Sequence, residues 1–185
     1  MFKTQIIDNA LPNRLANELE TILLTVFPWF LIDLNHRIIS KENNEVIDEG
    51  FADSLCCERG FPKSPFFNLF STVPQIALDK INYEGPVTIS QIRPWMQLPN
   101  GTPSRKNSIH LDFPYPHLVL LQYITDSDGD LFLYDQDETT IIDTIGYKRN
   151  RCILFDGRIP HCGSTPNDKK RIAISYTIKL DNYTE

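Results

Sequence analysis

The chain has 185 residues, of which 41% are hydrophobic, a length and a composition ordinary for one soluble globular domain. A chain of this size buries roughly two-thirds of its unfolded surface, so it needs neither disulfides nor a structural metal to fold. The formal net charge of -6 at pH 7 argues against a basic surface that would bind nucleic acid or an anionic membrane.

The chain begins with a predicted short strand, residues 2–7, followed by a predicted helix over residues 12–26. The helix is predicted because apolar residues such as Leu19 and Leu23 recur on one face at helical spacing. Pro12 suits the first turn of this helix, where a backbone N–H needs no helical partner. The N-terminus lacks the features of a signal peptide, since charged residues interrupt any apolar core.

The rest of the first half is predicted less completely. The apolar run at 22–32 is too short to cross a bilayer, which takes about 20 apolar residues. Residues 38–62 are polar and rich in glutamate, and no element is predicted for them. Residues 64–81 predict a second helix that breaks or kinks at Pro74, because proline removes a helical hydrogen bond. We therefore expect residues 1–85 to form a helical region that supports the remainder of the chain.

From residue 86 onward the pattern changes to short β segments. Strands are predicted at residues 87–93, 118–125, 131–135, 140–143, 151–155 and 171–179. Residues 94–108 hold three prolines and a glycine, which predicts a long loop with a functional role. Residues 126–129 predict a hairpin turn in which Gly129 is free to adopt positive φ. Helices first and short strands later predict an α+β fold, a single domain of residues 1–185 whose residues 86–180 form a jelly roll, also called a double-stranded β-helix.

Three residues in the second half, His110, Asp112 and His161, supply the groups of a metal site. Residues two apart in a strand point to the same face, so His110 and Asp112 can reach one ion together. His161, from a distant strand, completes a set of two imidazoles and one carboxylate. Such a set occupies one face of an Fe(II) octahedron and leaves three positions open. The pattern therefore predicts a catalytic Fe(II) site.

Zinc is the rival metal for the same three residues. Three ligands and a water would form a hydrolytic zinc site, but such a site needs a general base, and the sequence does not point to one. A surface histidine beside a turn aspartate is the alternative that involves no metal at all. The two remaining histidines, His36 and His117, are expected to be solvated or capping residues rather than ligands.

The cysteines indicate reduced thiols in a cytoplasmic protein. They are Cys56, Cys57, Cys152 and Cys162. None forms a pair with two residues between its members, which disfavours a zinc knuckle or a disulfide framework. Cys162 directly follows His161, so on a strand its side chain would face away from the metal.

Around these residues the second half of the chain, about residues 87–179, resembles the Fe(II)/2-oxoglutarate-dependent oxygenases, and most closely the prolyl hydroxylases among them. The resemblance rests on His110-x-Asp112, Gly129-Asp130-Leu131-Phe132-Leu133-Tyr134, Arg149-Asn150-Arg151-Cys152-Ile153-Leu154-Phe155, Pro160-His161 and Arg171-Ile172-Ala173-Ile174-Ser175. It implies a hydroxylase that uses Fe(II), O2 and 2-oxoglutarate as co-substrate, with ascorbate in support.

The resemblance also implies which residues bind the co-substrate. Arg171, ten positions after His161, matches the basic residue that pairs with the distal carboxylate of 2-oxoglutarate, to which a guanidinium gives two parallel hydrogen bonds. An ordinary strand-end charge is the alternative for Arg171. Tyr123 matches a tyrosine whose hydroxyl reaches the same carboxylate, the alternative being a core aromatic with a wet tip. Ser175 lies on the same face of the strand as Arg171 and can add a hydroxyl.

The acceptor is predicted to be a prolyl residue of a peptide or protein. The predicted loop 94–108, which carries Trp95 and Arg105 and begins next to Arg93, is placed to cover the mouth of the site. Trp95 or Tyr115 can stack there on an extended proline-rich chain. The alternative is that Trp95 is a core anchor and that the acceptor is a free amino acid or another small metabolite.

Two other classes of protein remain as alternatives. A non-catalytic jelly-roll binding module is disfavoured because all three ligands and Arg171 are retained. A nucleic-acid demethylase of the alkylation-repair type is disfavoured by the acidic composition and by the Ile-Ala-Ile-Ser-Tyr-Thr that follows Arg171. Asp112 also speaks against a halogenase, since the halogenating members of the family have a small residue there. The oligomeric state is left open.

Overall fold

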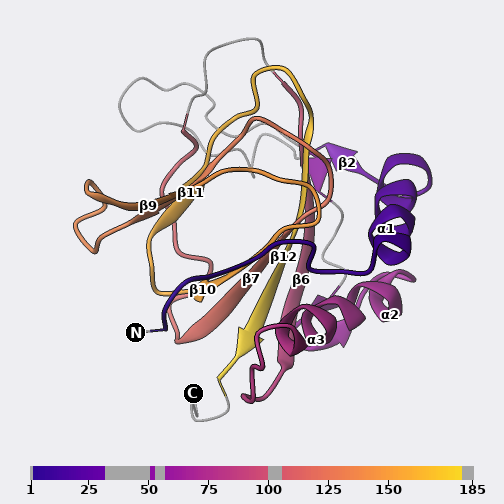
Figure 1. Cartoon of the computed structure of the whole chain (residues 1–185), viewed down its shortest axis with the longest axis horizontal. Helices are drawn as coiled ribbons and strands as arrows, with labels where there is room; N and C mark the ends of the chain where they lie inside the picture. Colours follow the sequence, from indigo (N-terminus) through magenta and orange to yellow (C-terminus); the bar gives the residue numbers. More distant parts are fainter. Residues whose placement is uncertain (1, 32–50, 53–56, 100–105, 181–185) are drawn as a thin grey trace.

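Two antiparallel β-sheets form the centre of the fold (Figure 1). The computed structural model describes residues 2–31, 51–52, 57–99 and 106–180. The strands are β1 (Gln5–Ile7), β2 (Phe30–Leu31), β3 (Phe51–Ala52), β4 (Cys57–Glu58), β5 (Phe61–Pro62), β6 (Thr88–Gln97), β7 (His117–Tyr123), β8 (Leu131–Tyr134), β9 (Ile141–Ile145), β10 (Cys152–Asp156), β11 (His161–Gly163) and β12 (Arg171–Lys179). The helices are α1 (Asn13–Thr25), α2 (Phe67–Phe70) and α3 (Thr72–Asp79).

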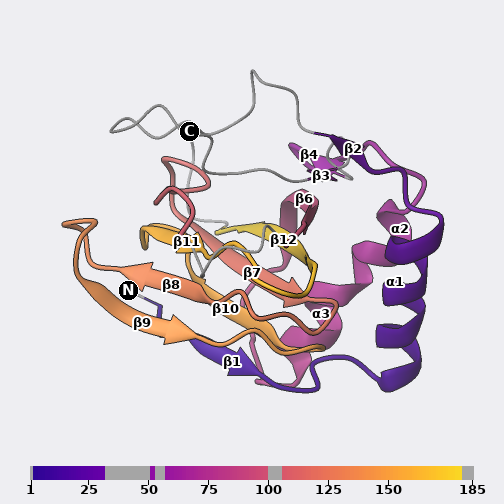
Figure 2. The same ribbon diagram turned by 90° about the horizontal axis from the view of Figure 1, so that it is seen from above.

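The larger sheet runs in the order β1-β10-β7-β12-β6-β3-β2, with β4 also paired to β6 and β5 paired to β4. The smaller sheet has the order β11-β8-β9. The three helices lie together on one side of the molecule (Figure 2). No helix in the described part of the chain is long and apolar enough to cross a membrane.

Alternation along the central strands divides the interior into two apolar layers. On one face of β12, Ile174 packs in a core with Leu19 of α1 and Leu78 of α3. On the other face, Ala173 packs in a second core with Leu133 of the smaller sheet. Successive residues of a strand point to opposite faces, so each odd-numbered residue from 171 to 175 of β12 faces the space between the sheets. Any site built from these residues therefore lies between the two sheets.

The strands of the second half lie where the sequence predicted them, within a few residues. β12 has the predicted bounds, whereas β6 continues four residues beyond the predicted end at Arg93, to Gln97. The prediction that the loop begins at Pro94 was therefore wrong. β12 pairs with β6 on one side. On the other side, β4 pairs with Gln91 and Ile92 and β3 pairs with Trp95 and Met96, so Pro94 lies between these two paired segments. Proline is tolerated at such an edge because its missing N–H breaks no ladder there.

The second predicted helix is two short helices. They meet at Ser71, between α2 and α3, and the predicted break at Pro74 was wrong. Pro74 instead lies in the first turn of α3, where the N–H groups have no helical partner and proline is tolerated. Within the region of residues 38–62, where no element was predicted, the structure describes β3, β4 and β5, and the rest lies outside the described residues.

The predicted hairpin turn at residues 126–129 is not a hairpin. It joins β7 to β8, which belong to different sheets. Gly129 also does not adopt positive φ; among the described glycines only Gly60 does. A Cβ at Gly129 would lie 2.8 Å from the carbonyl oxygen of Ser164, so close approach of two backbones, rather than a left-handed turn, explains this glycine.

Two of the cysteines, Cys152 and Cys162, are buried. The Sγ atom of Cys162 lies 3.6 Å from the hydroxyl of Tyr134. It does not line the cavity that His161 lines, as expected for neighbours on one strand. Cys56 lies outside the described residues.

Asp156, at the end of β10, is held as a carboxylate by Arg158. The Arg158 side chain donates from Nε and Nη2 at 2.9 and 2.7 Å, and these bonds lower the pKa of Asp156 to about 2. A carboxyl with a depressed pKa in the folded state stabilises the fold above its unfolded pKa, and this contribution is lost as the pH falls from about 4 to about 2. Since about half of the Arg158 side chain is exposed, solvent screens the pair.

We expect Asp156→Asn to lower the free energy of unfolding at pH 7 by about 1 kcal/mol. We also expect a shallower loss of stability between pH 4 and pH 2 than in the wild type. Urea unfolding followed by circular dichroism at a series of pH values measures both effects. Parallel pH profiles of the two proteins would contradict the assigned role.

Candidate metal centre and its pocket

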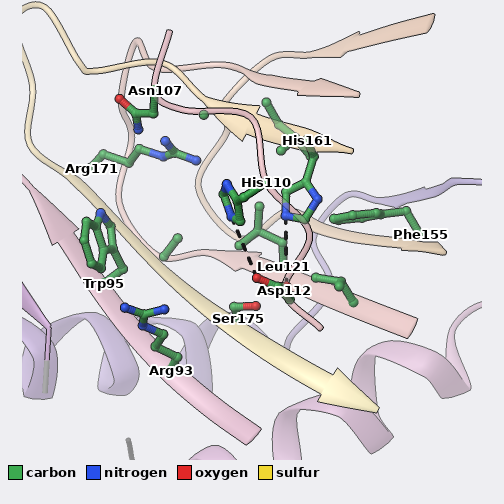
Figure 3. A pocket seen from close by; sticks show the side chains of 14 residues that line it. Arg93, Trp95, Asn107, His110, Asp112, Leu121, Phe155, His161, Arg171 and Ser175 are labelled. Carbon is green, nitrogen blue, oxygen red and sulfur yellow. Dashed lines mark ion pairs between the residues drawn. The ribbon is translucent and has the colours of Figure 1, made fainter. Parts of the chain in front are cut away.

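Three possible metal ligands, His110, Asp112 and His161, come together between the sheets. A backbone bridge links the two histidines: His110 N–H donates to the His161 carbonyl at 3.0 Å, and His161 N–H donates to the His110 carbonyl at 3.1 Å. The Nε2 atoms of His110 and His161 lie 3.8 and 4.0 Å from the Asp112 carboxylate (Figure 3). All three ligand atoms lie within 4.8 Å of one another, so one cation can contact all of them.

Backbone carbonyls orient both imidazoles. Nδ1 of His110 lies 3.0 Å from the carbonyl oxygen of Ser108, and Nδ1 of His161 lies 3.0 Å from that of Ile159. A carbonyl only accepts, so each Nδ1 donates to its carbonyl, and each Nε2 is the ring nitrogen left to bind a cation beside Asp112. This is the tautomer that a metal ligand needs.

The two histidines differ in exposure. Side-chain exposure is 44% at His110 and 8% at His161. Burial, together with the neighbouring His110, lowers the pKa of His161 to about 4, although Asp112 acts in the opposite direction. His161 is therefore a neutral imidazole at pH 7 and is ready to bind a cation without first losing a proton.

The three ligands line a cavity of about 270 Å³ between the sheets (Figure 3). The full set of lining residues is Arg93, Trp95, Asn107, His110, Asp112, Val119, Leu121, Leu131, Phe155, His161, Gly163, Arg171, Ala173 and Ser175. Four of them, Val119, Leu121, Leu131 and Phe155, form an apolar wall. Sequence reasoning did not find this wall, because its members come from three strands that meet only in the fold.

Arg171 enters the same cavity from the first position of β12 and is buried. Its Nη1 donates to the carbonyl oxygen of Ser164 at 3.3 Å, and its guanidinium carbon lies 5.7 Å from the ring centroid of Tyr147. Nε of Arg171 and the hydroxyl of Tyr123 are buried without a hydrogen-bond partner among the described residues. Buried donors without partners are costly, so they indicate an acceptor that binds there.

Tyr123 adds a neutral donor beside this guanidinium. Burial raises the pKa of Tyr123 to about 12, although the nearby Arg171 acts in the opposite direction. The ring stacks on that of Tyr147, with centroids 3.8 Å apart, and it does not itself line the cavity. A guanidinium whose Nε lacks a partner and a neutral hydroxyl without an acceptor fit the distal carboxylate of a dicarboxylic acid.

Gly163 is a site residue that sequence reasoning missed. It lies two positions after His161 on β11, so both face the cavity. A Cβ at Gly163 would lie 1.9 Å from Nη1 of Arg171, and only glycine leaves room for the guanidinium. The alternation rule that placed Cys162 away from the metal would have found this position.

Asn107 is a second missed residue. Its side-chain oxygen accepts hydrogen bonds from Thr165 Oγ1 at 3.0 Å and from Gln97 Nε2 at 3.3 Å. Its backbone N–H donates to the Gly163 carbonyl at 2.8 Å. Asn107 thus ties the segment that carries His110 to β6 and β11. A lone asparagine in a predicted loop gave no signal of this role.

The residues predicted to bind the acceptor are only partly brought together. Arg93 and Trp95 both line the cavity from β6, although Trp95 was predicted to lie in a loop. Ser175, predicted to help bind the co-substrate, lines the cavity from β12. Tyr115 does not line the cavity; its ring stacks on Phe113 with centroids 5.0 Å apart. Arg105 lies outside the described residues.

His117 is fully buried, so the expectation of a solvated side chain was wrong; its Nδ1 lies 2.7 Å from the carbonyl oxygen of Tyr115. It begins β7, and its ring makes edge contacts with Phe113 and Tyr115. A Cβ at Gly157 would lie 2.1 Å from Nε2 of His117, so the backbone just after β10 packs against the imidazole ring. His117 is not among the clustered ligands. His36 lies outside the described residues.

Solved structures match the fold at low sequence identity. An oxidoreductase of the 2OG-Fe(II) oxygenase family from Burkholderia pseudomallei matches with a TM-score of 0.69 and 9% identity over 94% of this chain and 84% of its own. A prolyl hydroxylase from Trichoplax adhaerens was solved in complex with a peptide fragment of the hypoxia inducible factor oxygen degradation domain. It matches with a TM-score of 0.63 and 17% identity over 97% of this chain and 84% of its own. The non-heme alpha ketoglutarate dependent epimerase SnoN from nogalamycin biosynthesis matches with a TM-score of 0.62 and 12% identity over 96% of this chain and 77% of its own.

No protein-family model and no curated protein sequence matches the chain. The structural likeness nevertheless shows that the chain has the jelly-roll fold of the 2-oxoglutarate- and Fe(II)-dependent oxygenases, prolyl hydroxylases included. The predicted fold is confirmed at this level.

Proposed function

We propose that this chain is an Fe(II)- and 2-oxoglutarate-dependent dioxygenase that hydroxylates a C–H bond. One observation carries the proposal: a His-Asp-His cluster lines the same cavity as a buried arginine, Arg171, whose Nε has no hydrogen-bond partner among the described residues. A hydrolytic zinc site would account for the three ligands but would leave Arg171 without a role. A dicarboxylic co-substrate that reaches from the metal to Arg171 accounts for both.

His110, Asp112 and His161 hold Fe(II) in this proposal, and Arg171 and Tyr123 receive the distal carboxylate of 2-oxoglutarate. When bound, Fe(II) and 2-oxoglutarate supply the activation of O2 that C–H hydroxylation requires. The carbonyls of Ser108 and Ile159 keep the two imidazoles in the ligating tautomer. The apolar wall lines the cavity beside the ligands and limits the access of water to the reacting carbon.

For the acceptor we propose first a prolyl residue of a peptide or protein. The Trichoplax adhaerens enzyme of the same fold is a prolyl hydroxylase in complex with such a peptide. Trp95 lines the cavity with partial exposure and offers an indole face to proline. A free amino acid or another small metabolite is the second candidate, favoured by the small cavity volume of about 270 Å³.

The first test is 2-oxoglutarate turnover by the purified chain, measured as succinate formed with Fe(II), ascorbate and O2. We expect succinate above the protein-free rate, its loss with a chelator and its absence when Zn(II) replaces Fe(II). A panel of proline-containing peptides, free amino acids and small metabolites is then screened by mass spectrometry for a product heavier by one oxygen. No succinate under any condition would favour a non-catalytic binding module.

Gly163→Ala is expected to weaken 2-oxoglutarate binding while leaving the metal ligands in place. The new methyl group would overlap Nη1 of Arg171, so the guanidinium must move from its position in the cavity. We expect the KM for 2-oxoglutarate to rise by about tenfold, the loss of a single charge-assisted hydrogen bond. Steady-state kinetics and iron content measure the two quantities, and an unchanged KM would show that Arg171 tolerates the methyl group.

A further inference from the structure

Arg93 is a second cation in the cavity that the proposed chemistry does not use. Its guanidinium carbon lies 5.5 Å from the ring centroid of Trp95, and both side chains line the cavity. Within the described part of the chain, no carboxylate pairs with Arg93, and its side chain has one described contact, the one with Trp95. The side chain is exposed, held on an aromatic face and open to an anion that enters the cavity.

Arg93 stands too far from Arg171 to share its ligand. In the register of β6 and β12, Gln97 lies opposite Arg171 and Arg93 lies opposite Ser175. Four residues along a strand correspond to roughly 13 Å. Trp95 lies between these two pairs in the register, opposite Ala173. Only three carbon atoms separate the carboxylates of 2-oxoglutarate, so a co-substrate between the metal ligands and Arg171 leaves Arg93 for another molecule.

We propose that the acceptor carries a carboxylate and that Arg93 receives it, with the indole of Trp95 against the adjacent carbon atoms. This proposal rests on the proposed function, which requires an acceptor, and it adds the chemical class of that acceptor. A guanidinium offers a carboxylate two parallel hydrogen bonds, a geometry that a lysine cannot give. The carboxylate belongs either to a small acid or to an acidic residue or C-terminus of a peptide.

The surroundings of Arg93 fit a carboxylate better than a phosphate. A phosphate is commonly held by several donors, such as a helix N-terminus or a group of cations. Among the described residues that line the cavity, Arg93 and Arg171 are the cationic side chains, and Arg171 lies at the far end. Opposite Arg93 in the register of β6 and β12 lies Ser175, whose neutral side chain also lines the cavity.

The cavity also limits how large the acceptor is. Its volume of about 270 Å³ is at the small end for a ligand pocket. Arg93 and the metal ligands line this one space, so the carboxylate and the oxidised carbon are close in the acceptor. They belong to one small molecule or to neighbouring residues of a peptide.

The test measures binding, with turnover prevented. The full chain is loaded with Fe(II) and saturating 2-oxoglutarate without O2, so that the metal and Arg171 are occupied. Matched pairs of probes are titrated by calorimetry: free L-amino acids against their carboxamides, and acetylated tripeptide amides with glutamate or glutamine beside proline. We expect at least one acid to bind about tenfold or more tightly than its amide. Arg93→Ala should abolish this preference, and Arg93→Glu should reverse it.

Lys179→Ala is the matched control, because it removes an exposed positive charge from the other end of β12. It should keep the preference for the acid. The proposal is overturned if no pair discriminates in the wild type, or if discrimination survives Arg93→Ala. It is also overturned if a phosphoserine tripeptide binds more tightly than its glutamate counterpart.

Separate measurements distinguish this proposal from the proposed function. Succinate formation in air tests the proposed dioxygenase activity. If no succinate forms but acids still bind more tightly than their amides in an Arg93-dependent way, the dioxygenase is rejected and the carboxylate site is kept. A KM for 2-oxoglutarate that rises as much in Arg93→Ala as in Arg171→Ala would place Arg93 at the co-substrate and overturn the present inference.

Discussion

His161→Ala is expected to abolish Fe(II)-dependent formation of succinate. The substitution removes one of the three proposed metal ligands, a buried imidazole whose Nε2 lies 4.0 Å from the Asp112 carboxylate. Loss of an outer partner of a ligand already costs roughly 10–100-fold in metal affinity, so loss of a ligand itself should exceed that. Iron content after gel filtration and succinate formation at saturating 2-oxoglutarate measure the two effects.

Asp112→Ala tests the same cluster at a site with less risk to folding, since 19% of its side chain is exposed. His117→Gln is the matched control, a change at a histidine that is equally buried but is not among the clustered ligands. It should retain iron and turnover in the fraction that folds, as judged by circular dichroism. Near-normal activity of His161→Ala with loss of activity in His117→Gln would reassign the ligand set.

Arg171→Ala should raise the KM for 2-oxoglutarate strongly while iron binding is retained. The Arg171 guanidinium is buried. A carboxylate bound there would lose its charged partner in a site where water does not take the place of that charge. Such a loss costs about 2–5 kcal/mol, which corresponds to a change on the order of 30-fold to several thousand-fold in affinity. Steady-state kinetics with 2-oxoglutarate as the varied substrate measure it.

Two milder variants sharpen this test. Tyr123→Phe removes one neutral donor and should cost about 1 kcal/mol, or roughly fivefold. Arg171→Lys keeps the charge but loses the planar fork, and its KM should fall between those of the wild type and Arg171→Ala. Equal affinity for 2-oxoglutarate in the wild type and Arg171→Ala would show that the orphaned donors serve another purpose.

The sequence was sufficient wherever the information is local. The bounds of β12 follow from the apolar pattern within that segment. His110 and Asp112 come together as the two-residue spacing predicted, but the predicted strand was wrong: His110 forms an isolated bridge with His161, and Asp112 lies in a bend. The same rule, applied onward from His161, explains why Gly163 rather than Cys162 faces Arg171.

What the sequence could not predict depends on contacts between distant segments. Whether residues 126–129 close a hairpin or cross between sheets depends on which strands pair, and both possibilities fit the same turn residues. Trp95 belongs to a strand because β12 lies beside β6, although the prolines near it predict a loop. His117 is buried against Gly157 and the rings of Phe113 and Tyr115, and its contact with Gly157 depends on the pairing of β7 with β10.

The alternation of β12 between two environments has a genetic counterpart. Ile172, Ile174 and Tyr176 face the helices, so substitutions there should reduce the amount of folded protein. Arg171 and Ser175 face the cavity, so substitutions there should reduce turnover per folded molecule and leave abundance nearly intact. In a saturation mutagenesis experiment scored separately for abundance and for activity, the two profiles along this strand should oscillate with a period of two residues and opposite phase.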